Sequence, residues 1–237
     1  QISRTMIFGK LYNARRSIDR TCRDHSLRVD MNQLSAASRQ LQTLLSQVKE
    51  ETSLEHLRGL EGVGANAYFG VFNDMILGDR EAFYFHGRNR RPPLDAVNAL
   101  LSFAYSLLAH DCASALESIG LDSHVGFLHR DRPGRTSLAL DLMEELRPCM
   151  ADRFVLTLIN NRMLKASDFL YMESGAVLLS DSGRKVFLKN WQEKKKDILT
   201  HPYLGEKLPW GMIPYIQALL LARYLRGDMD AYPPFLR

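Results

Sequence analysis

The sequence predicts a mainly α-helical fold with one small β-hairpin. Through most of the 237 residues, apolar positions recur every three or four residues, which is the period of an amphipathic helix. Glycine, proline or capping residues separate these stretches, and one short segment instead has the pattern of a hairpin. A hydrophobic content of 46% is enough to bury a sizeable core, so we expect one domain over residues 1–237.

The first half of the chain contains long predicted helices. A basic helical pattern opens the sequence, and residues 32–47 form an amphipathic helix. Ser53 can cap the next helix, which ends before Gly78. After the turn HGRNRRPP, a long helix covers about 94–119 and stops at Gly120.

The second half contains shorter elements. Thr136 or Ser137 caps the helix LALDLMEEL, and Pro148 starts the following helix after a bend. The segment DFLYMESGAVLLS is the predicted hairpin, with its turn at Ser174-Gly175. The remaining elements are a basic helix capped by Asp181 or Ser182 and a last helix over 214–226.

Charge and cysteine usage narrow the class of protein. The formal net charge of +4 is compatible with an acidic partner such as nucleic acid but does not require one. Three widely spaced cysteines without a C-x-x-C pair argue against a disulfide framework or a cysteine zinc site, and indicate a cytoplasmic protein. The longest apolar run, residues 99–109, is shorter than the roughly 20 residues of a membrane span, and no secretory signal is visible.

One short helix carries three carboxylates opposite its apolar face: Asp141, Glu144 and Glu145. Asp141 and Glu144 are i, i+3 neighbours, and at about 5 Å two ionised carboxylates repel by roughly 3 kcal/mol for an effective dielectric of about 20. A divalent cation removes that repulsion, and oxygen ligands suit Mg or Mn. The alternative is a solvated acidic face, which is the commoner arrangement on helices.

The loop before this helix adds a histidine and several arginines. His129 can supply a nitrogen ligand or a general base, whereas simple exposure is the alternative. Arg130, Arg132 and Arg135 can place guanidinium groups along a phosphate backbone. Their alternative is a soluble turn.

Glu61 is the other unusual carboxylate. It lies on or beside the apolar stripe of its helix, where a charge needs a partner. Gly59, Gly62 and Gly64 surround it, and each costs about 1 kcal/mol relative to alanine in a helix interior. We therefore expect close helix packing or access for a ligand there, while the alternative is a glutamate that reaches solvent.

Three of these segments, in this order and spacing, resemble the CRISPR-associated integrase family, CRISPR-associated protein one. They are LRGLEGVGANAYF, FHGRNRRPPLDAVNALLSFAYSLL and GFLHRDRPGRTSLALDLMEELRP. The stretch LPWGMIPYIQALLLARYLRGDMDAYPPF is similar to the version found in subtype I-C systems. The resemblance covers the C-terminal, helical catalytic part of the family, and the family's N-terminal β-rich domain has no counterpart, so we expect a fragment that lacks it.

The resemblance implies a metal-dependent DNA integrase and endonuclease. Family members join the 3′-hydroxyl ends of a short foreign DNA duplex to the CRISPR repeat by metal-assisted transesterification. They act as homodimers with a small ferredoxin-like partner, the second CRISPR-associated protein. Matched to this sequence, the ligands of Mg or Mn are Glu61, His129 and Glu144, with Asp141 as an auxiliary carboxylate that replaces or orients Glu144.

Basic residues beside these motifs are the predicted contacts to the DNA backbone. Besides the three arginines that follow His129, they comprise Arg88, Arg90 and Arg91 in the proline-rich turn. Arg147 is expected to pair with an acidic residue or a phosphate near the site. The alternative function is a DNA-binding and assembly module whose catalytic chemistry is incomplete without the missing domain.

Overall fold

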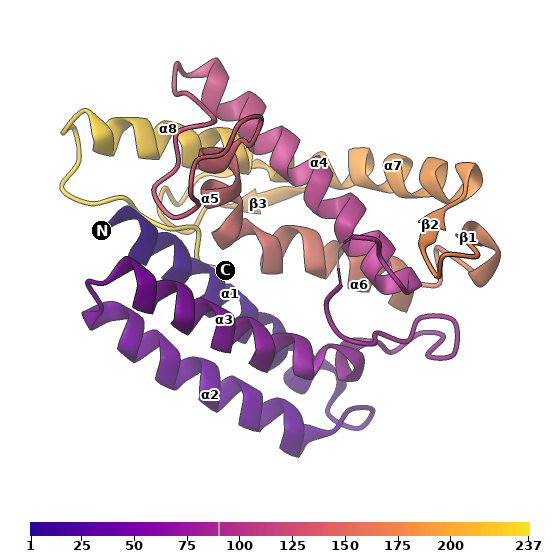
Figure 1. Ribbon diagram of the computed structural model, residues 1–237. Helices are drawn as coiled ribbons and strands as arrows, with labels where there is room; N and C mark the ends of the chain where they lie inside the picture. Colours follow the sequence, from indigo (N-terminus) through magenta and orange to yellow (C-terminus); the bar gives the residue numbers. More distant parts are fainter. Residues whose placement is uncertain (90) are drawn as a thin grey trace.

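A computed structural model describes residues 1–89 and 91–237, so the predicted DNA contact Arg90 lies outside the described residues. Helices dominate the fold, as predicted (Figure 1). The first three helices lie side by side, and α5 packs against both α1 and α4. The helices are α1 (Ile2–His25), α2 (Met31–Glu50), α3 (Leu54–Gly70), α4 (Ala96–Ser118), α5 (Ser137–Leu146), α6 (Arg153–Asn160), α7 (Asp181–Lys195) and α8 (Ile213–Leu225).

The N-terminal helices follow from capping and periodicity. Leu34, Leu41 and Val48 of the predicted stripe on α2 are fully buried. The Ser53 side chain caps α3 by accepting a hydrogen bond from the His56 backbone N–H at 3.3 Å. A short 3-10 helix, Phe72–Met75, extends α3 towards Gly78.

The predicted bend at Pro148 is a π-helical turn, Arg147–Asp152, between α5 and α6. Proline has no backbone N–H, so the regular hydrogen-bond ladder cannot continue through it. Thr136 precedes α5, but its side chain makes no capping hydrogen bond. The chain therefore passes from α5 into α6 through a widened turn, with Cys149 and Met150 on it.

Two small antiparallel hairpins are present where one was predicted. β1 (Phe169–Tyr171) pairs with β2 (Val177–Leu179), with Phe169 opposite Leu179. Their turn includes Gly175 at φ +80°, which glycine adopts without strain. The second hairpin, β3 (Ile198–Thr200) with β4 (Lys207–Pro209), was missed because its connection, 201–206, is longer than the roughly two to five residues of a recognisable hairpin turn.

The apolar helix α4 forms part of the core. By length and composition it could cross a membrane, with a mean hydropathy of 1.3 over its most apolar window. In the fold it packs against α5, α6 and α8, and Leu100, Leu101 and Leu108 are fully buried. Packing within the protein therefore accounts for its apolar composition.

The glycines around Glu61 differ in their surroundings. A Cβ built on Gly64 would lie 2.2 Å from Leu11 Cδ2 of α1, and Leu11 is only 1% exposed. A Cβ on Gly62 or Gly59 would have no neighbour within 4 Å. The expected close packing therefore holds at Gly64, where α1 and α3 meet.

We expect Gly64→Ala to lower the free energy of unfolding by about 1–2 kcal/mol, because overpacking against Leu11 outweighs the gain in helix propensity. Gly62→Ala is the matched control on the same helix, and it should raise the free energy of unfolding by about 1 kcal/mol. Urea unfolding of both variants measures the difference. Equal stabilisation by the two alanines would contradict the packing argument.

The C-terminal segment is anchored to a buried carboxylate of α5. Glu145 accepts hydrogen bonds from the Tyr232 hydroxyl at 2.5 Å, the Gln217 amide at 2.7 Å and the Phe235 backbone N–H at 3.2 Å. The Asn13 amide donates to the carbonyl oxygens of both Glu145 and Phe235 at 2.7 Å. This network holds the last residues of the chain against α1 and α5.

Burial raises the pKa of Glu145 from 4.5 to about 7, against the lowering effect of its hydrogen-bond donors. The folded state therefore binds this proton more tightly than the unfolded state does, so its stabilisation is complete below about pH 4.5 and is lost as the pH rises through 7. We expect the free energy of unfolding to fall by roughly 2–3 kcal/mol between about pH 5 and pH 8. Urea unfolding across this window should show the fall, and Glu145→Gln should make it smaller, leaving the part that Asp152 contributes, because burial also raises the pKa of Asp152, to about 6.

Candidate active site

Three predicted ligands from distant parts of the chain line one pocket. Glu61 comes from α3, His129 from the loop before α5, and Glu144 from α5 itself. Lys10 of α1 lies between the two glutamates: its Nζ forms ion pairs with Glu61 Oε1 and, at 2.7 Å, with Glu144 Oε2. Lys10 is therefore the charged partner that we expected for Glu61 from its place on the apolar stripe of its helix.

Glu144 is held ionised by two cations. Its side chain is 4% exposed, and Oε1 accepts from the Arg147 guanidinium at 3.0 Å. Burial opposes ionisation, but Arg147 and then Lys10 outweigh it and lower the pKa of Glu144 from 4.5 to about 2. Oε2 has an ion-pair contact to Lys10 but no hydrogen bond of normal geometry with any described residue. One buried oxygen of Glu144 is thus incompletely satisfied.

Asp141 organises the loop that carries His129. Its Oδ2 accepts from the backbone N–H groups of Phe127 and Leu128 at 2.6 and 2.8 Å. Its Oδ1 accepts from the His129 backbone N–H at 2.9 Å and lies 2.6 Å from His129 Nδ1. An ionised carboxylate can only accept, so Nδ1 carries a proton, and Nε2 lies 3.7 Å from Glu144 Oε1.

The geometry adds a contact of Asp141 that was not expected. The resemblance implied that Asp141 replaces or orients Glu144; in the fold both Asp141 oxygens accept hydrogen bonds from the loop, and the side chain that it contacts is that of His129. The solvated acidic face is also absent, because Asp141, Glu144 and Glu145 are all at least 97% buried. Helix α5 is short and lies between α1, α4 and α8, so its polar side is covered as well.

Two arginines among the predicted DNA contacts lie at the floor of the site, and Arg147 makes the acidic pairing that was one of its two expected roles. Arg147, which is 8% exposed, pairs with Glu144 and lies 5.2 Å from the Tyr105 ring centroid. Arg88 is half-buried, donates to Asn98 Oδ1 at 2.7 Å and lies at the same distance of 5.2 Å from that ring. Their guanidinium groups are engaged inside the protein.

The other predicted contacts lie nearer to solvent. Arg130 and Arg132 are exposed, Arg135 is half-buried, and all three line the pocket with the predicted ligands. Arg58 of α3 also lines it and was missed by sequence analysis; it donates through Nε to the Leu128 carbonyl at 3.1 Å. Arg91 is exposed in the proline-rich turn and is not among the residues that line this pocket.

The residues fit a divalent cation on one condition. One histidine nitrogen and two carboxylates are donors that Mg and Mn accept, and Glu144 has a buried oxygen without a normal hydrogen bond. Among the described residues, however, no three acidic, histidine or cysteine side chains are grouped closely enough to hold a metal ion as they stand. The Lys10 ammonium lies between the carboxylates, so a cation can join them only if Lys10 moves aside.

Comparison with known proteins agrees with this fold. The family model described as "CRISPR associated protein Cas1" matches residues 1–193. A relative from Rhodospirillum rubrum, "CRISPR-associated endonuclease Cas1 2", is 52% identical over 238 residues, covering 99% of this chain and 69% of the relative.

Two solved structures share the fold. A "casposase bound to integration product" has a TM-score of 0.84 and 26% identity, covering 100% of this chain and 63% of that chain. A "partial Cas6-RT-Cas1–Cas2 complex" has a TM-score of 0.81 and 25% identity, covering 99% of this chain and 67% of that chain. This chain thus spans less than two thirds of the casposase. From the extent of the family match and the identity to its relatives, the chain belongs to the Cas1 family of CRISPR-associated proteins.

Proposed function

We propose that this chain is a metal-dependent DNA endonuclease and integrase of CRISPR adaptation. It would join the 3′-hydroxyl ends of short foreign DNA to the CRISPR repeat by transesterification. The observation that carries the proposal is the meeting of Glu61, His129 and Glu144 in one pocket rimmed by arginines. Relatives named as Cas1 endonucleases, and a structural neighbour bound to an integration product, support the same reaction class.

In this proposal Glu61, His129 and Glu144 hold Mg or Mn. The chemistry that such an ion supplies is polarisation of the scissile phosphate and neutralisation of charge on the displaced oxygen. Asp141 keeps the proton on His129 Nδ1, which leaves Nε2 as the donor atom. Arg147 fixes one oxygen of Glu144 and keeps that carboxylate ionised.

Lys10 has two roles in the proposed site. Without a metal ion, its ammonium balances the charge of Glu61 and Glu144 and holds both side chains in place. A metal ion bound to these carboxylates would displace the ammonium, which would then be free to pair with a phosphate group of the DNA.

The exposed arginines are the proposed contacts to the DNA backbone. Arg130, Arg132 and Arg135 surround the pocket, and phosphate contacts of this kind bind DNA without reading its sequence. Arg91 is a further candidate in the proline-rich turn. Double-stranded DNA is therefore the proposed substrate, both as the captured duplex and as the CRISPR repeat.

The wider setting follows from the family. We propose that residues 1–237 form the helical catalytic domain, of the subtype I-C kind, and that a family N-terminal domain supports a homodimer in the full-length protein. A solved complex containing Cas1 and Cas2 makes Cas2 the proposed protein partner. The proposed compartment is the cytoplasm.

A DNA-binding and assembly module is the second candidate, and one observation favours it. Lys10 already lies between the two carboxylates, and no ready-made cluster of metal ligands is present among the described residues. If Lys10 cannot be displaced in this chain alone, DNA would bind without being cut or joined.

The experiment that separates them measures Mn-dependent cleavage and disintegration of a branched DNA by this chain. Glu61→Ala and His129→Ala are compared with the matched controls Glu55→Ala and His124→Ala, which remove an exposed carboxylate of α3 and an exposed histidine of the same loop. The enzyme proposal expects activity that EDTA removes and that only the first two variants lose, with circular dichroism unchanged. DNA binding that is salt-sensitive but without any Mn-dependent product would instead support the module.

A further inference from the structure

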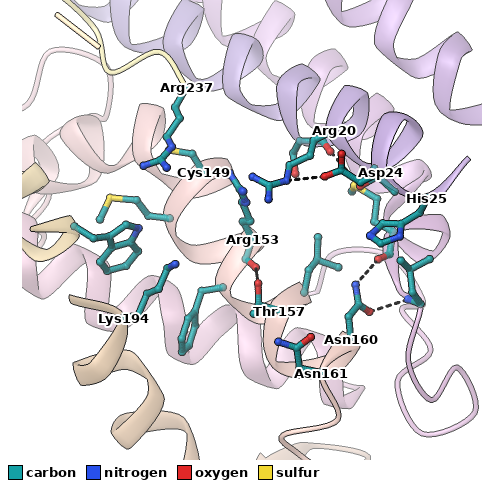
Figure 2. A pocket seen from close by; sticks show the side chains of 18 of the residues that line it. Arg20, Asp24, His25, Cys149, Arg153, Thr157, Asn160, Asn161, Lys194 and Arg237 are labelled. Carbon is teal, nitrogen blue, oxygen red and sulfur yellow. Dashed lines mark hydrogen bonds and ion pairs between the residues drawn. The ribbon is translucent and has the colours of Figure 1, made fainter. Parts of the chain in front are cut away.

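A second cavity of about 380 Å³ lies between α1, α6, the end of α7 and the C-terminal residues (Figure 2). It shares no lining residue with the pocket of Glu61, His129 and Glu144. Along α1, Lys10 and Arg20 are separated by ten residues, a rise of about 15 Å, so the cavity is a separate site. We refer to it as the basic groove.

Most of the charged side chains that line the basic groove are positive. They are Arg20, Arg153, Lys194 and Arg237, and Figure 2 shows Arg20 and Arg153 near one another, with Arg237 entering separately from the C-terminal segment. Asp24 is the sole carboxylate side chain among the described lining residues. The groove therefore has a large excess of positive charge.

Internal partners neutralise only part of this charge. Asp24 is shared, since it accepts from Arg20 at 3.2 Å and from Arg23 at 2.9 Å, and Lys194 pairs with Asp197 at 2.7 Å. The guanidinium groups of Arg153 and Arg237 form no hydrogen bond or ion pair within the described part of the chain. For the half-buried Arg153, this leaves a partly desolvated cation that an anionic ligand would stabilise.

The lining favours phosphate groups over bases as the recognised feature. Guanidinium groups match phosphate oxygens in a bidentate fork, and the exposed Thr157 and Asn161 add polar groups beside them. Trp210 also lines the groove but is 5% exposed, so its ring is not available for a base to stack on. A cavity of about 380 Å³ has the volume of a small-molecule pocket, which suits a short segment of one strand better than a double helix.

We propose that the basic groove binds the phosphodiester backbone of single-stranded DNA, without sequence preference, through Arg153 and Arg237. The choice of DNA rests on the proposed function, whereas the anionic character of the ligand rests on these side chains alone. The site is additional to the pocket in which the proposed reaction takes place.

The test is fluorescence anisotropy of a labelled single strand of about 15 nucleotides, titrated with the chain in EDTA at several salt concentrations. Because each phosphate contact contributes about 0.7 to the slope of log affinity against log salt, Arg153→Gln with Arg237→Gln should reduce the slope by roughly 1.4. The affinity at low salt should fall roughly tenfold. The matched control is Lys185→Gln with Lys189→Gln, which removes two exposed charges of α7 outside the groove.

A loss of affinity and slope confined to the groove variant, with its circular dichroism unchanged, supports the proposal. An equal loss in the α7 control would show only a non-specific effect of net charge and would overturn it. A second outcome would also overturn the proposal: the groove variant loses binding of a labelled polyglutamate peptide but keeps its binding of DNA. The ligand of the groove would then be an acidic protein. Mn-dependent cleavage is measured separately, so a chain without that activity but with groove-dependent DNA binding would refute the proposed function and leave this inference standing.

Discussion

Lys10→Met is expected to lower the free energy of unfolding by about 3–5 kcal/mol in metal-free buffer. The ammonium of Lys10 contacts carboxylate oxygens of both Glu61 and Glu144, and its side chain is 11% exposed. Methionine keeps most of the volume but leaves two partly or fully buried carboxylates facing each other without their shared cation. Removing one partner of a buried charged group is costly because the remaining charge stays desolvated.

Mn²⁺ should offset this loss, because the proposed metal site uses the same carboxylates. We expect Mn²⁺ to raise the melting temperature of Lys10→Met more than that of the unmodified chain, since no ammonium has to be displaced before binding. Differential scanning fluorimetry with and without Mn²⁺ measures this, and it does not depend on DNA or on activity. Lys189→Met, which changes an exposed lysine of α7, should show neither the loss nor the added response.

A double variant tests whether the instability of Lys10→Met comes from the carboxylates that lose their shared cation. Lys10→Met with Glu61→Gln removes one of the two carboxylates, so it should be more stable than Lys10→Met alone, and the effects of the two substitutions should not add. If Mn²⁺ raised the melting temperature of Lys10→Met no more than that of the unmodified chain, Lys10 would be part of a structural ion pair and would not occupy the place of a metal ion.

The local structure was largely predictable from the sequence. The Ser53 cap, the buried stripe of α2 and the turn at Gly175 each depend on a few neighbouring residues. The covered acidic side of α5 was not predictable, because it depends on packing against α1, α4 and α8, which are distant in sequence. Periodicity indicates which face of a helix is apolar, but it does not show whether the polar face is covered too.

The site was predictable only in part. Nothing in spacing alone brings Glu61 near His129, and the family resemblance supplied that pairing. Lys10 was missed because it looked like one of several basic residues in the first helix. Its position was nevertheless informative: Met6, Lys10 and Ala14 recur every four residues and all three are buried, so a lysine in that apolar stripe required a buried partner.

Asp141→Asn is expected to cost about 3 kcal/mol of stability and to reduce Mn-dependent activity roughly 10- to 100-fold. Asp141 accepts hydrogen bonds from three backbone N–H groups and from His129 Nδ1. Asparagine has a single accepting oxygen, so its amide group must face either the N–H groups of Phe127 and Leu128 or those of His129. In both orientations two donors meet an N–H group instead of an oxygen.

The effect on His129 separates a positioning role from a purely structural one. With Asp141 present, Nδ1 carries a proton, so a neutral His129 ring has its lone pair on Nε2, 3.7 Å from Glu144 Oε1. In the orientation that turns the asparagine amide group towards His129, Nδ1 loses its acceptor and the other tautomer becomes populated, which places a proton on Nε2 and blocks it as a donor atom. Nitrogen-15 NMR of the His129 ring reports the tautomer directly, in the absence of metal and DNA.

The matched control for this substitution is Asp131→Asn. Asp131 is an exposed residue of the same loop that accepts one hydrogen bond, from the Gly126 backbone N–H at 3.2 Å. We expect Asp131→Asn to change the free energy of unfolding by less than about 1 kcal/mol and to leave the tautomer of His129 unchanged. If Asp141→Asn lost stability and activity while Nδ1 remained protonated, Asp141 would serve to hold the loop and would not set the proton on His129. The metal affinity of the site would then depend on the position of the loop alone.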